Sequence, residues 1–92
     1  MRKYDPEKIY TVTCHSSINN GKRQSFEIVA SFLNYNDATE RLNDLKDEAL
    51  ENFKEIYGDQ VTVIHDDDKC IVRTLNDDDI LTIEIKITFL YR

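Results

Sequence analysis

Two runs of three aspartates and a few cysteines and histidines are the residues of this sequence whose types could carry out chemistry. Both aspartate runs lie in the stretch DDDKCIVRTLNDDD, residues 66–79, and carboxylate oxygens are the ligands that Ca²⁺ and Mg²⁺ prefer in proteins. Four further residues have side chains of the kind that bind zinc: Cys14, His15, His65 and Cys70. Either set makes a metal site only if the fold brings its members together.

The spacing of the aspartates argues against one shared cation site. If residues 66–69 and 76–79 form hairpin loops, the two runs lie at opposite ends of one strand, roughly 20 Å apart at about 3.4 Å per residue. A calcium loop beginning at Asp66 also fails, because Ile71 occupies the position that needs glycine. We therefore expect no metal and interpret both runs as solvated turns that a partner can reach: Asp66, Asp67, Asp68, Asp77, Asp78 and Asp79.

Zinc binding and catalysis are not predicted either. Cys14 and His15 are adjacent in a β-branched run, so their side chains point to opposite faces, and no C-x-x-C or H-x-x-x-H pair is present. The sequence also has no G-x-S-x-G elbow and no glycine-rich phosphate loop. Ser16 lies beside His15, but adjacency in sequence is not the geometry of a nucleophile and its base. We expect no enzyme activity and no cofactor.

The composition is that of one small globular domain, residues 1–92. Hydrophobic residues make up 40% and charged residues 33% of the chain, which favours a modest core over disorder. The net charge of −6 is uneven: residues 1–34 carry three acids and five bases (+2), and residues 35–92 carry fifteen acids and seven bases (−8). An acidic field of this kind disfavours direct binding of nucleic acid and favours basic partners.

The cysteine count and the N-terminal sequence predict a cytoplasmic protein. Two cysteines in 92 residues favour free thiols in a reducing compartment. The stretch MRKYDPEKIY has no apolar run after its charges, and no segment of the chain is long and apolar enough to span a membrane. We expect a protein of the cytoplasm, in a bacterial or host cell, without membrane contact.

The spacing of apolar residues predicts two strands, a helix and three further strands. β-branched and aromatic runs mark the strands at residues 8–15, 25–33, 60–65, 70–75 and 80–91. This ββαβββ order, with short connections between the last three strands, predicts an α+β fold: an antiparallel β-sheet of about five strands with one α-helix packed on one face. Two arrangements stay open, because the first hairpin either joins the edge of the last three strands or forms a separate layer.

The helix is predicted over residues 37–57. Asn36 or Asp37 can cap its start, and Gly58 stands where helices commonly end in a left-handed residue. One side of the helix is apolar and is expected to face the sheet: Ala38, Leu42, Leu45, Ala49, Phe53 and Ile56.

The two proposed loops also predict the register of the last three strands. Val63 then lies opposite Val72, and Val72 lies opposite Ile83. Both hairpins place apolar side chains on the same face of the sheet, as a consistent register should. In the last strand, the alternation from Leu81 to Phe89 predicts one apolar face against the helix.

The first hairpin carries a second apolar surface. A two-residue turn at Asn20-Gly21 pairs Ile28 with Thr13 and Ala30 with Thr11. An apolar set then remains together on the other face of the hairpin: Tyr10, Val12, Val29 and Leu33. A sheet that a helix covers on one side does not need apolar residues on both. This set is therefore a candidate face for a homodimer.

The predicted outer face of the helix is strongly acidic. At 100° per residue, six acids fall in a sector about 100° wide, opposite the apolar side, and extend over roughly 22 Å. They are Glu40, Asp44, Asp47, Glu48, Glu51 and Glu55. Like charges four residues apart destabilise a helix by a few tenths of a kcal/mol per pair, so stability alone does not favour this pattern.

The leading hypothesis is a non-enzymatic interaction protein whose acidic helix face, with the aspartate turns, binds a basic surface of a partner, for example of a nucleic-acid-binding protein. In size and charge the chain resembles the small acidic inhibitors of phages and mobile elements, the anti-CRISPR proteins among them; no motif carries this resemblance. One rival is a homodimeric accessory module that uses the apolar hairpin face. Another is a nucleic-acid binder that uses five bases of the first 34 residues: Arg2, Lys3, Lys8, Lys22 and Arg23.

Overall fold

The computed structural model describes residues 7–90 and confirms the predicted α+β fold in the order ββαβββ. The elements are β1 (Glu7–Ile18), β2 (Arg23–Phe32), α1 (Tyr35–Tyr57), β3 (Val61–His65), β4 (Lys69–Thr74) and β5 (Ile80–Leu90). Residue 91, the end of the predicted last strand, lies outside the described residues, as do Arg2 and Lys3.

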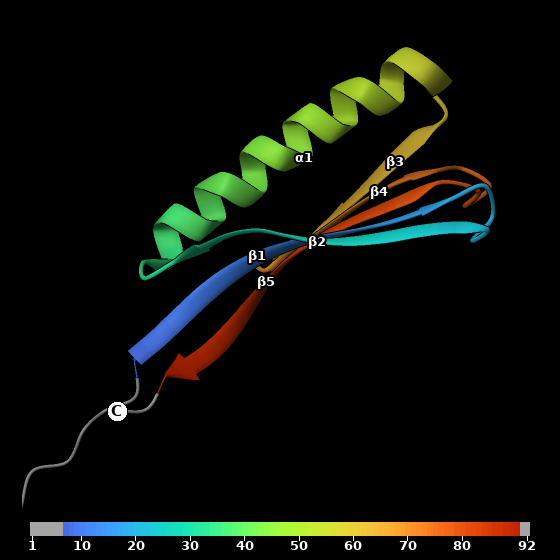
Figure 1. The fold of residues 1–92 in the computed structure, drawn as a ribbon. Coiled ribbons are helices and arrows are strands. Elements are labelled where there is room, and N and C mark those ends of the chain that lie inside the picture. Colours follow the sequence, from blue (N-terminus) through green and yellow to red (C-terminus); the bar gives the residue numbers. More distant parts are fainter. Residues whose placement is uncertain (1–6, 91–92) are drawn as a thin grey trace, which may run out of the picture.

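All five strands form one antiparallel sheet in the order β2-β1-β5-β4-β3. The first hairpin joins the edge of the last three strands, because β1 pairs with β5 along nearly its whole length. This decides between the two arrangements that the sequence left open. The sheet is strongly twisted, and α1 lies across one of its faces (Figure 1).

The register of the last three strands was predicted correctly for one hairpin and shifted for the other. Val63 lies opposite Val72 as expected. Val72, however, lies opposite Leu81 and not Ile83. The loop begins one residue earlier than predicted, since Thr74 N–H donates to the Asp79 carbonyl oxygen (3.1 Å). The resulting shift is two residues, which leaves every side chain on its predicted face.

The first hairpin keeps the predicted register near its turn, but the turn is longer than predicted and a bulge follows. β1 ends at Ile18 and β2 begins at Arg23, so four residues rather than two connect the strands. Lys22 N–H donates to the Asn19 carbonyl oxygen within this turn (3.2 Å), and Asn19, Asn20 and Gly21 have positive φ angles of 57°, 57° and 83°. Ile28 lies opposite Thr13 as predicted. Beyond Thr13 the register shifts by one residue.

The bulge changes which residues face one another near the end of the hairpin. The shift lies between Val12 and Thr13 on β1, and it places Ala30 opposite Val12 rather than Thr11. The predicted pairing of Ala30 with Thr11 is therefore wrong. The extra residue on β2 interrupts the ladder between the two strands at this point.

The helix begins two residues earlier than predicted and ends as predicted. The Asn34 side chain accepts a hydrogen bond from Asn36 N–H (2.7 Å), so Asn34 is the capping residue rather than Asn36 or Asp37. At the other end, Gly58 has a φ of 65° and its N–H donates to the Lys54 carbonyl oxygen (2.9 Å).

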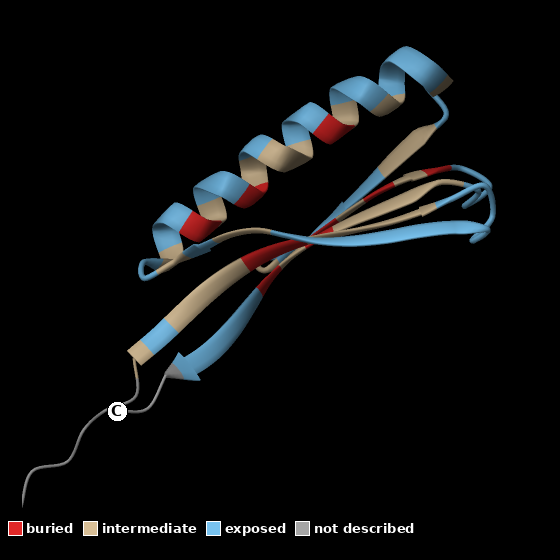
Figure 2. Cartoon of the chain, in the orientation of Figure 1, coloured by how far each residue is buried: buried red, intermediate tan, exposed pale blue. Residues whose placement is uncertain are grey.

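The core lies between α1 and the middle of the sheet (Figure 2). One cluster of buried residues joins the helix to β1 and β5, and a second joins it to β4. Their buried members are Val12, Ala38, Leu42, Ile83 and Ile85 in the first, and Ala49, Cys70 and Val72 in the second. Leu45 and Phe53 pack against these clusters as expected, but Ile56 is 71% exposed.

Two apolar surfaces differ from the sequence prediction. Val12 is completely buried, and Tyr10 and Val29 pack against its cluster, so α1 covers these residues of the proposed homodimer face and the assignment of that face is wrong. Leu33 follows β2 and is exposed. In β5, Ile87 and Phe89 are each 46% exposed, because the helix covers only the first half of that strand.

Candidate functional site

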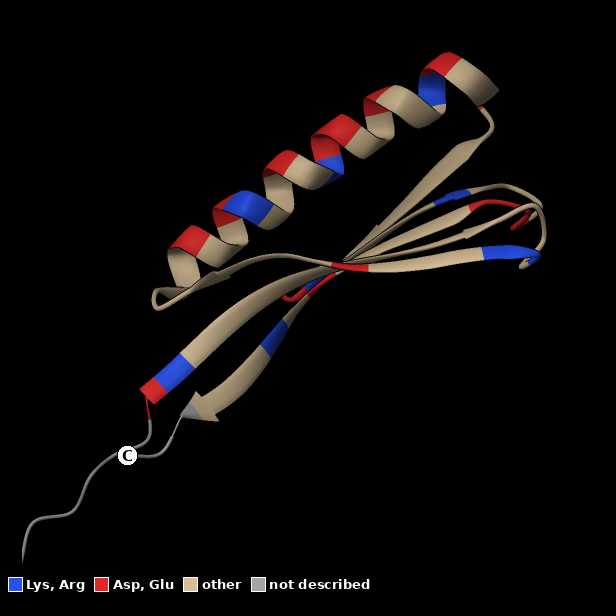
Figure 3. Ribbon diagram, in the orientation of Figure 1, with Lys and Arg blue, Asp and Glu red and all other residues tan. Residues whose placement is uncertain are grey.

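The six predicted acids of α1 form one exposed surface, which we call the acidic helix face (Figure 3). The helical period places them opposite Ala38, Leu42 and Ala49, the three helix residues buried against the sheet. All six acids are exposed: Glu40, Asp44, Asp47, Glu48, Glu51 and Glu55. The predicted geometry of this surface is therefore confirmed.

Little of the negative charge on this face is neutralised within the chain. Lys46 Nζ lies 3.4 Å from Asp47 Oδ1, and no other ion pair involves these six acids among residues 7–90. The one basic residue of the last helical turn is Lys54. An exposed pair such as Lys46–Asp47 contributes little stability, so the acidic helix face stays available to an external cation.

The first aspartate loop lies beside the helix and adds to the acidic surface. A shallow hollow of about 220 Å³ is lined by His65 at the end of β3, by Asp66 and Asp67 from the loop and by Thr39 and Asn43 from α1. Asp66 and Asp67 are exposed. Because Asn43 neighbours Asp47 and Glu40 on the helix surface, these two loop acids continue the acidic helix face toward β3.

Asp68, the third residue of this loop, has a structural role instead. Its side chain accepts a hydrogen bond from the Tyr35 hydroxyl, and its carbonyl oxygen accepts one from Ile85 N–H (2.8 Å). These contacts fasten the loop to the start of α1 and to β5. The hydrogen bond to Asp68, followed by partial burial of the ring, raises the pKa of Tyr35 from its ordinary value.

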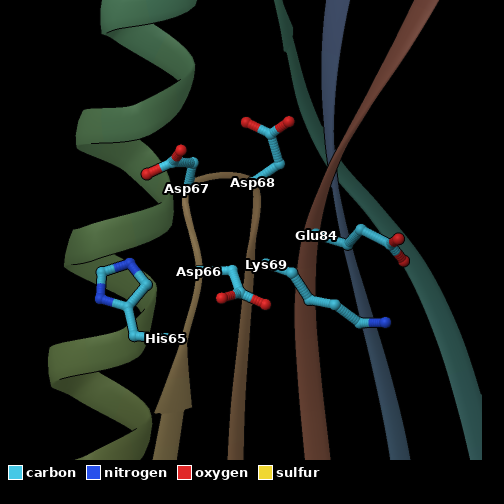
Figure 4. Close-up of a pocket in the computed structure, with 6 residues that line it drawn as sticks. All are labelled: His65, Asp66, Asp67, Asp68, Lys69 and Glu84. Carbon is cyan, nitrogen blue, oxygen red and sulfur yellow. The ribbon is translucent and has the colours of Figure 1, made fainter.

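The geometry of the first loop does not suit a cation. Its three carboxylates point in different directions rather than toward a common point (Figure 4). Among the residues that the structure describes, no group of three or more His, Cys, Asp and Glu side chains is arranged to hold a metal ion.

The second aspartate loop is tied to the first hairpin. Asp79 Oδ1 accepts a hydrogen bond from Asn19 N–H (2.9 Å), and the Asp78 carbonyl oxygen accepts one from Asn20 N–H (2.8 Å). Asp77 Oδ1 lies 3.5 Å from Arg73 Nε. Since the two loops lie at opposite ends of β4, Asp77, Asp78 and Asp79 are separate from Asp66 and Asp67.

The cysteines and histidines do not converge. Cys14 belongs to the helix side of β1, and His15 belongs to the opposite side, as predicted. His65 lies opposite Cys70 in the β3–β4 pair. Both thiols are free, and burial raises the pKa of each, with the carboxylate of Glu27 adding to the rise at Cys14.

The sequence did not lead us to predict a functional role for the face of the sheet that points away from α1, which we call the open face. One row of it crosses all five strands: Phe26, His15, Thr82, Ile71 and Ile64. Phe26 and Ile28 are 57% and 64% exposed. The alternation of polar and apolar residues in QSFEI could have indicated this surface, because it places Phe26 and Ile28 on one face of a strand.

The open face also differs in charge from the helix. Lys69, Arg73 and Lys86 lie on it with two acids of the strands, Glu7 and Glu84. Lys86 Nζ lies 5.4 Å from the centre of the Phe26 ring, a cation–π distance. The acids of the helix and these three bases of the sheet are therefore on opposite sides of the molecule.

Comparisons with known proteins give no functional assignment. The chain matches no protein-family model, no curated protein and no solved structure. Among the described residues, no helix combines the length and apolar character that crossing a membrane requires.

Proposed function

We propose that this chain is a small non-enzymatic interaction protein whose acidic helix face binds a basic surface of a partner protein. The observation that carries the proposal is the exposure of all six acids on one side of α1, with only Asp47 in an ion pair among the described residues. An unneutralised row of one sign attracts a surface of the opposite sign and accelerates its encounter. Asp66 and Asp67 enlarge the row at one side.

The linear density of these charges favours a partner surface that normally holds nucleic acid. Six carboxylates over roughly 22 Å correspond to about one per 4 Å along the helix. Phosphates of one DNA strand follow one another at about 3.4 Å along the axis. In this proposal the chain acts in the cytoplasm as a nucleic-acid-mimicking inhibitor, of the phage or mobile-element type to which the anti-CRISPR proteins belong.

The energetics of the helix support a role for the charges. The pairs Glu40–Asp44, Asp44–Glu48 and Glu51–Glu55 each place two acids four residues apart on the exposed face. Each such pair destabilises a helix by about 0.2–0.5 kcal/mol. A helix selected for stability alone would alternate the signs of these charges, whereas a helix that binds a basic surface retains them.

Binding of an arginine-rich peptide, measured by calorimetry at about 50 and about 200 mM salt, tests this proposal. Substituting Asp44→Lys and Glu51→Lys together is expected to weaken binding at least about tenfold, a loss of about 1.4 kcal/mol. The matched control is Asp59→Lys with Asp78→Lys, which changes the net charge equally at two exposed residues outside α1.

The control separates a local surface from net charge. The control variant is expected to retain most of the peptide affinity of the unsubstituted chain. Equal weakening by both variants would show that net charge alone attracts the peptide, and the acidic helix face would then have no special role. Affinity that does not fall with salt would contradict an electrostatic surface altogether.

A further inference from the structure

Within the part of the chain that the structure describes, the outer edge of β2 has no partner strand. β2 is the first strand in the sheet order, and among residues 7–90 it pairs with β1 only. From Arg23 to Ile28 every residue of the strand is exposed. A free edge with apolar side chains is a template for pairing with another strand. Phe26 and Ile28 supply the apolar side chains here.

The pairing of the strands determines whether the backbone N–H and C=O groups of each β2 residue point toward β1 or toward the free edge. Ile85 N–H donates to Asp68, so Ile85 faces β4. Because backbone groups alternate in direction along an antiparallel strand, Glu84 directs its groups toward β1, where it pairs with Thr13. The next residue of β1, Cys14, then directs its groups toward β2, where it pairs with Glu27. Glu27 and Ser25 therefore direct their backbone groups to β1, whereas Gln24, Phe26 and Ile28 direct theirs outward.

The charges on β2 complement one another only across two chains. Arg23 and Glu27 lie on the same face, since they pair with Ile18 and Cys14 of β1. They are four residues apart in an extended strand, about 14 Å, which is too far for an ion pair. Neither forms an ion pair with a described residue.

We propose that β2 pairs antiparallel with β2 of a second copy of this chain, about a two-fold axis at Ser25. In this register Arg23 lies opposite the copy's Glu27 on one face, twice by symmetry. Gln24 lies opposite the copy's Phe26, and both residues direct their backbone groups outward, so two such pairs form four hydrogen bonds. No like charges are opposed, and the two sheets join into one of ten strands.

This dimer uses a surface different from the acidic helix face and does not depend on the proposed function. The two phenylalanine rings are diagonal neighbours on the open face, at a separation that aromatic side chains can bridge. The contact is limited to one strand and its side chains, which is small for a protein interface. The dimer is therefore expected to form in a concentration-dependent way.

Sedimentation over a range of concentrations tests the proposal, with the mass rising from 10.8 kDa toward twice that value. Gln24→Pro removes one outward N–H and no bond to β1, and proline is tolerated on such an edge; it is expected to abolish the dimer, whereas the matched control Gln24→Ala retains it. A chain that stays monomeric at every concentration, or a dimer that survives Gln24→Pro, would overturn the proposal.

Charge exchange tests the register. Arg23→Glu or Glu27→Arg alone places like charges opposite one another at two symmetric positions and is expected to weaken dimerisation about tenfold. The double variant Arg23→Glu/Glu27→Arg restores the opposite charges and is expected to recover the dimer. If the double variant is as weak as the single ones, Arg23 does not face Glu27 and the axis at Ser25 is wrong.

A disulfide gives a second readout of the register. Ser25→Cys places two cysteines opposite each other at a Cα separation of about 4.5 Å, within the range that a disulfide spans. Mild oxidation is expected to link the two chains. The matched control Ser31→Cys lies on the same strand but six residues from the axis and is expected not to link. Linkage of the control in place of Ser25→Cys would contradict this pairing.

Discussion

The acidic helix face and the free edge of β2 are both exposed, but they offer a partner different interactions. The helix face presents side chains of one charge on a backbone whose hydrogen bonds are made within the helix. The β2 edge presents unpaired backbone groups together with one cation, Arg23, and one anion, Glu27. The first attracts from a distance and tolerates many orientations, whereas the second requires contact in one register.

This difference implies that salt separates the two surfaces. Binding through the acidic helix face weakens as ionic strength rises, because the charges are exposed and screened. Pairing of β2 strands depends mainly on backbone hydrogen bonds and the burial of Phe26 and Ile28, and it is expected to change much less. The two proposed interactions can therefore be studied separately in one protein.

The largest expected effect comes from the core that both surfaces share. Leu42 of α1 is completely buried against β1 and β5. Leu42→Ala therefore leaves a cavity and is expected to lower the free energy of unfolding by about 3 kcal/mol. Denaturant titration followed by circular dichroism measures the loss. Both surfaces should disappear in a single transition.

If the helix and the sheet melted independently, the two surfaces would not share one core. The control is Ile56→Ala, because Ile56 is also an apolar helix residue but is 71% exposed. It is expected to change the free energy of unfolding by less than about 0.5 kcal/mol. A large effect of Ile56→Ala would mean that the end of α1 is packed differently.

The contrast between Leu42 and Ile56 also marks how far the sequence predicts the fold. Local patterns gave the element order, the β3–β4 register and the inner position of Leu42, since each depends on periodicity or on a turn within the same segment. Ile56 has the correct helical angle for the core, yet it belongs to neither buried cluster and is exposed in the last turn of α1. Such an end effect depends on tertiary arrangement.

The remaining differences have the same origin. The bulge between Val12 and Thr13 was not predicted because no local pattern in the strand reveals it, and the cap at Asn34 was not predicted because Asn36 and Asp37 offered equally good local patterns. For the candidate site, the helical period predicted the exposed acids. It could not predict that Asp68 binds Tyr35 or that Asp79 binds the turn at Asn19, since both contacts join segments distant in sequence.

A smaller effect of opposite sign is expected on the acidic helix face. Asp44→Lys converts two repulsive pairs, with Glu40 and Glu48, into attractive ones, and is expected to raise the free energy of unfolding by about 0.5–1 kcal/mol at low salt. Thermal unfolding at two salt concentrations measures this gain, which should shrink as salt screens the charges. The variant would be more stable and bind cations less well.

The neutral variant Asp44→Asn provides the control for this prediction. It removes the repulsion without adding attraction, so it should give about half of the stabilisation. A loss of stability on Asp44→Lys would indicate that Asp44 makes a favourable contact in the folded chain. In that case the acids of α1 would support the fold, and the contrast between a charged binding face and a paired strand edge would weaken.

The smallest expected effect lies beside the edge of β2, at Cys14. Burial and the carboxylate of Glu27 raise the pKa of Cys14, so more of the thiol is protonated at a given pH and its alkylation is slow. Glu27→Gln removes the second cause and is expected to speed alkylation at pH 8 by a small factor, measured by mass spectrometry at low protein concentration. Cys70, which is completely buried, serves as the internal control because its rate should not change. If the alkylation rate at Cys14 did not change on Glu27→Gln, the Glu27 carboxylate would lie away from the thiol. It would then also lie away from the face of β2 on which the proposed pairing with Arg23 of a second copy requires it.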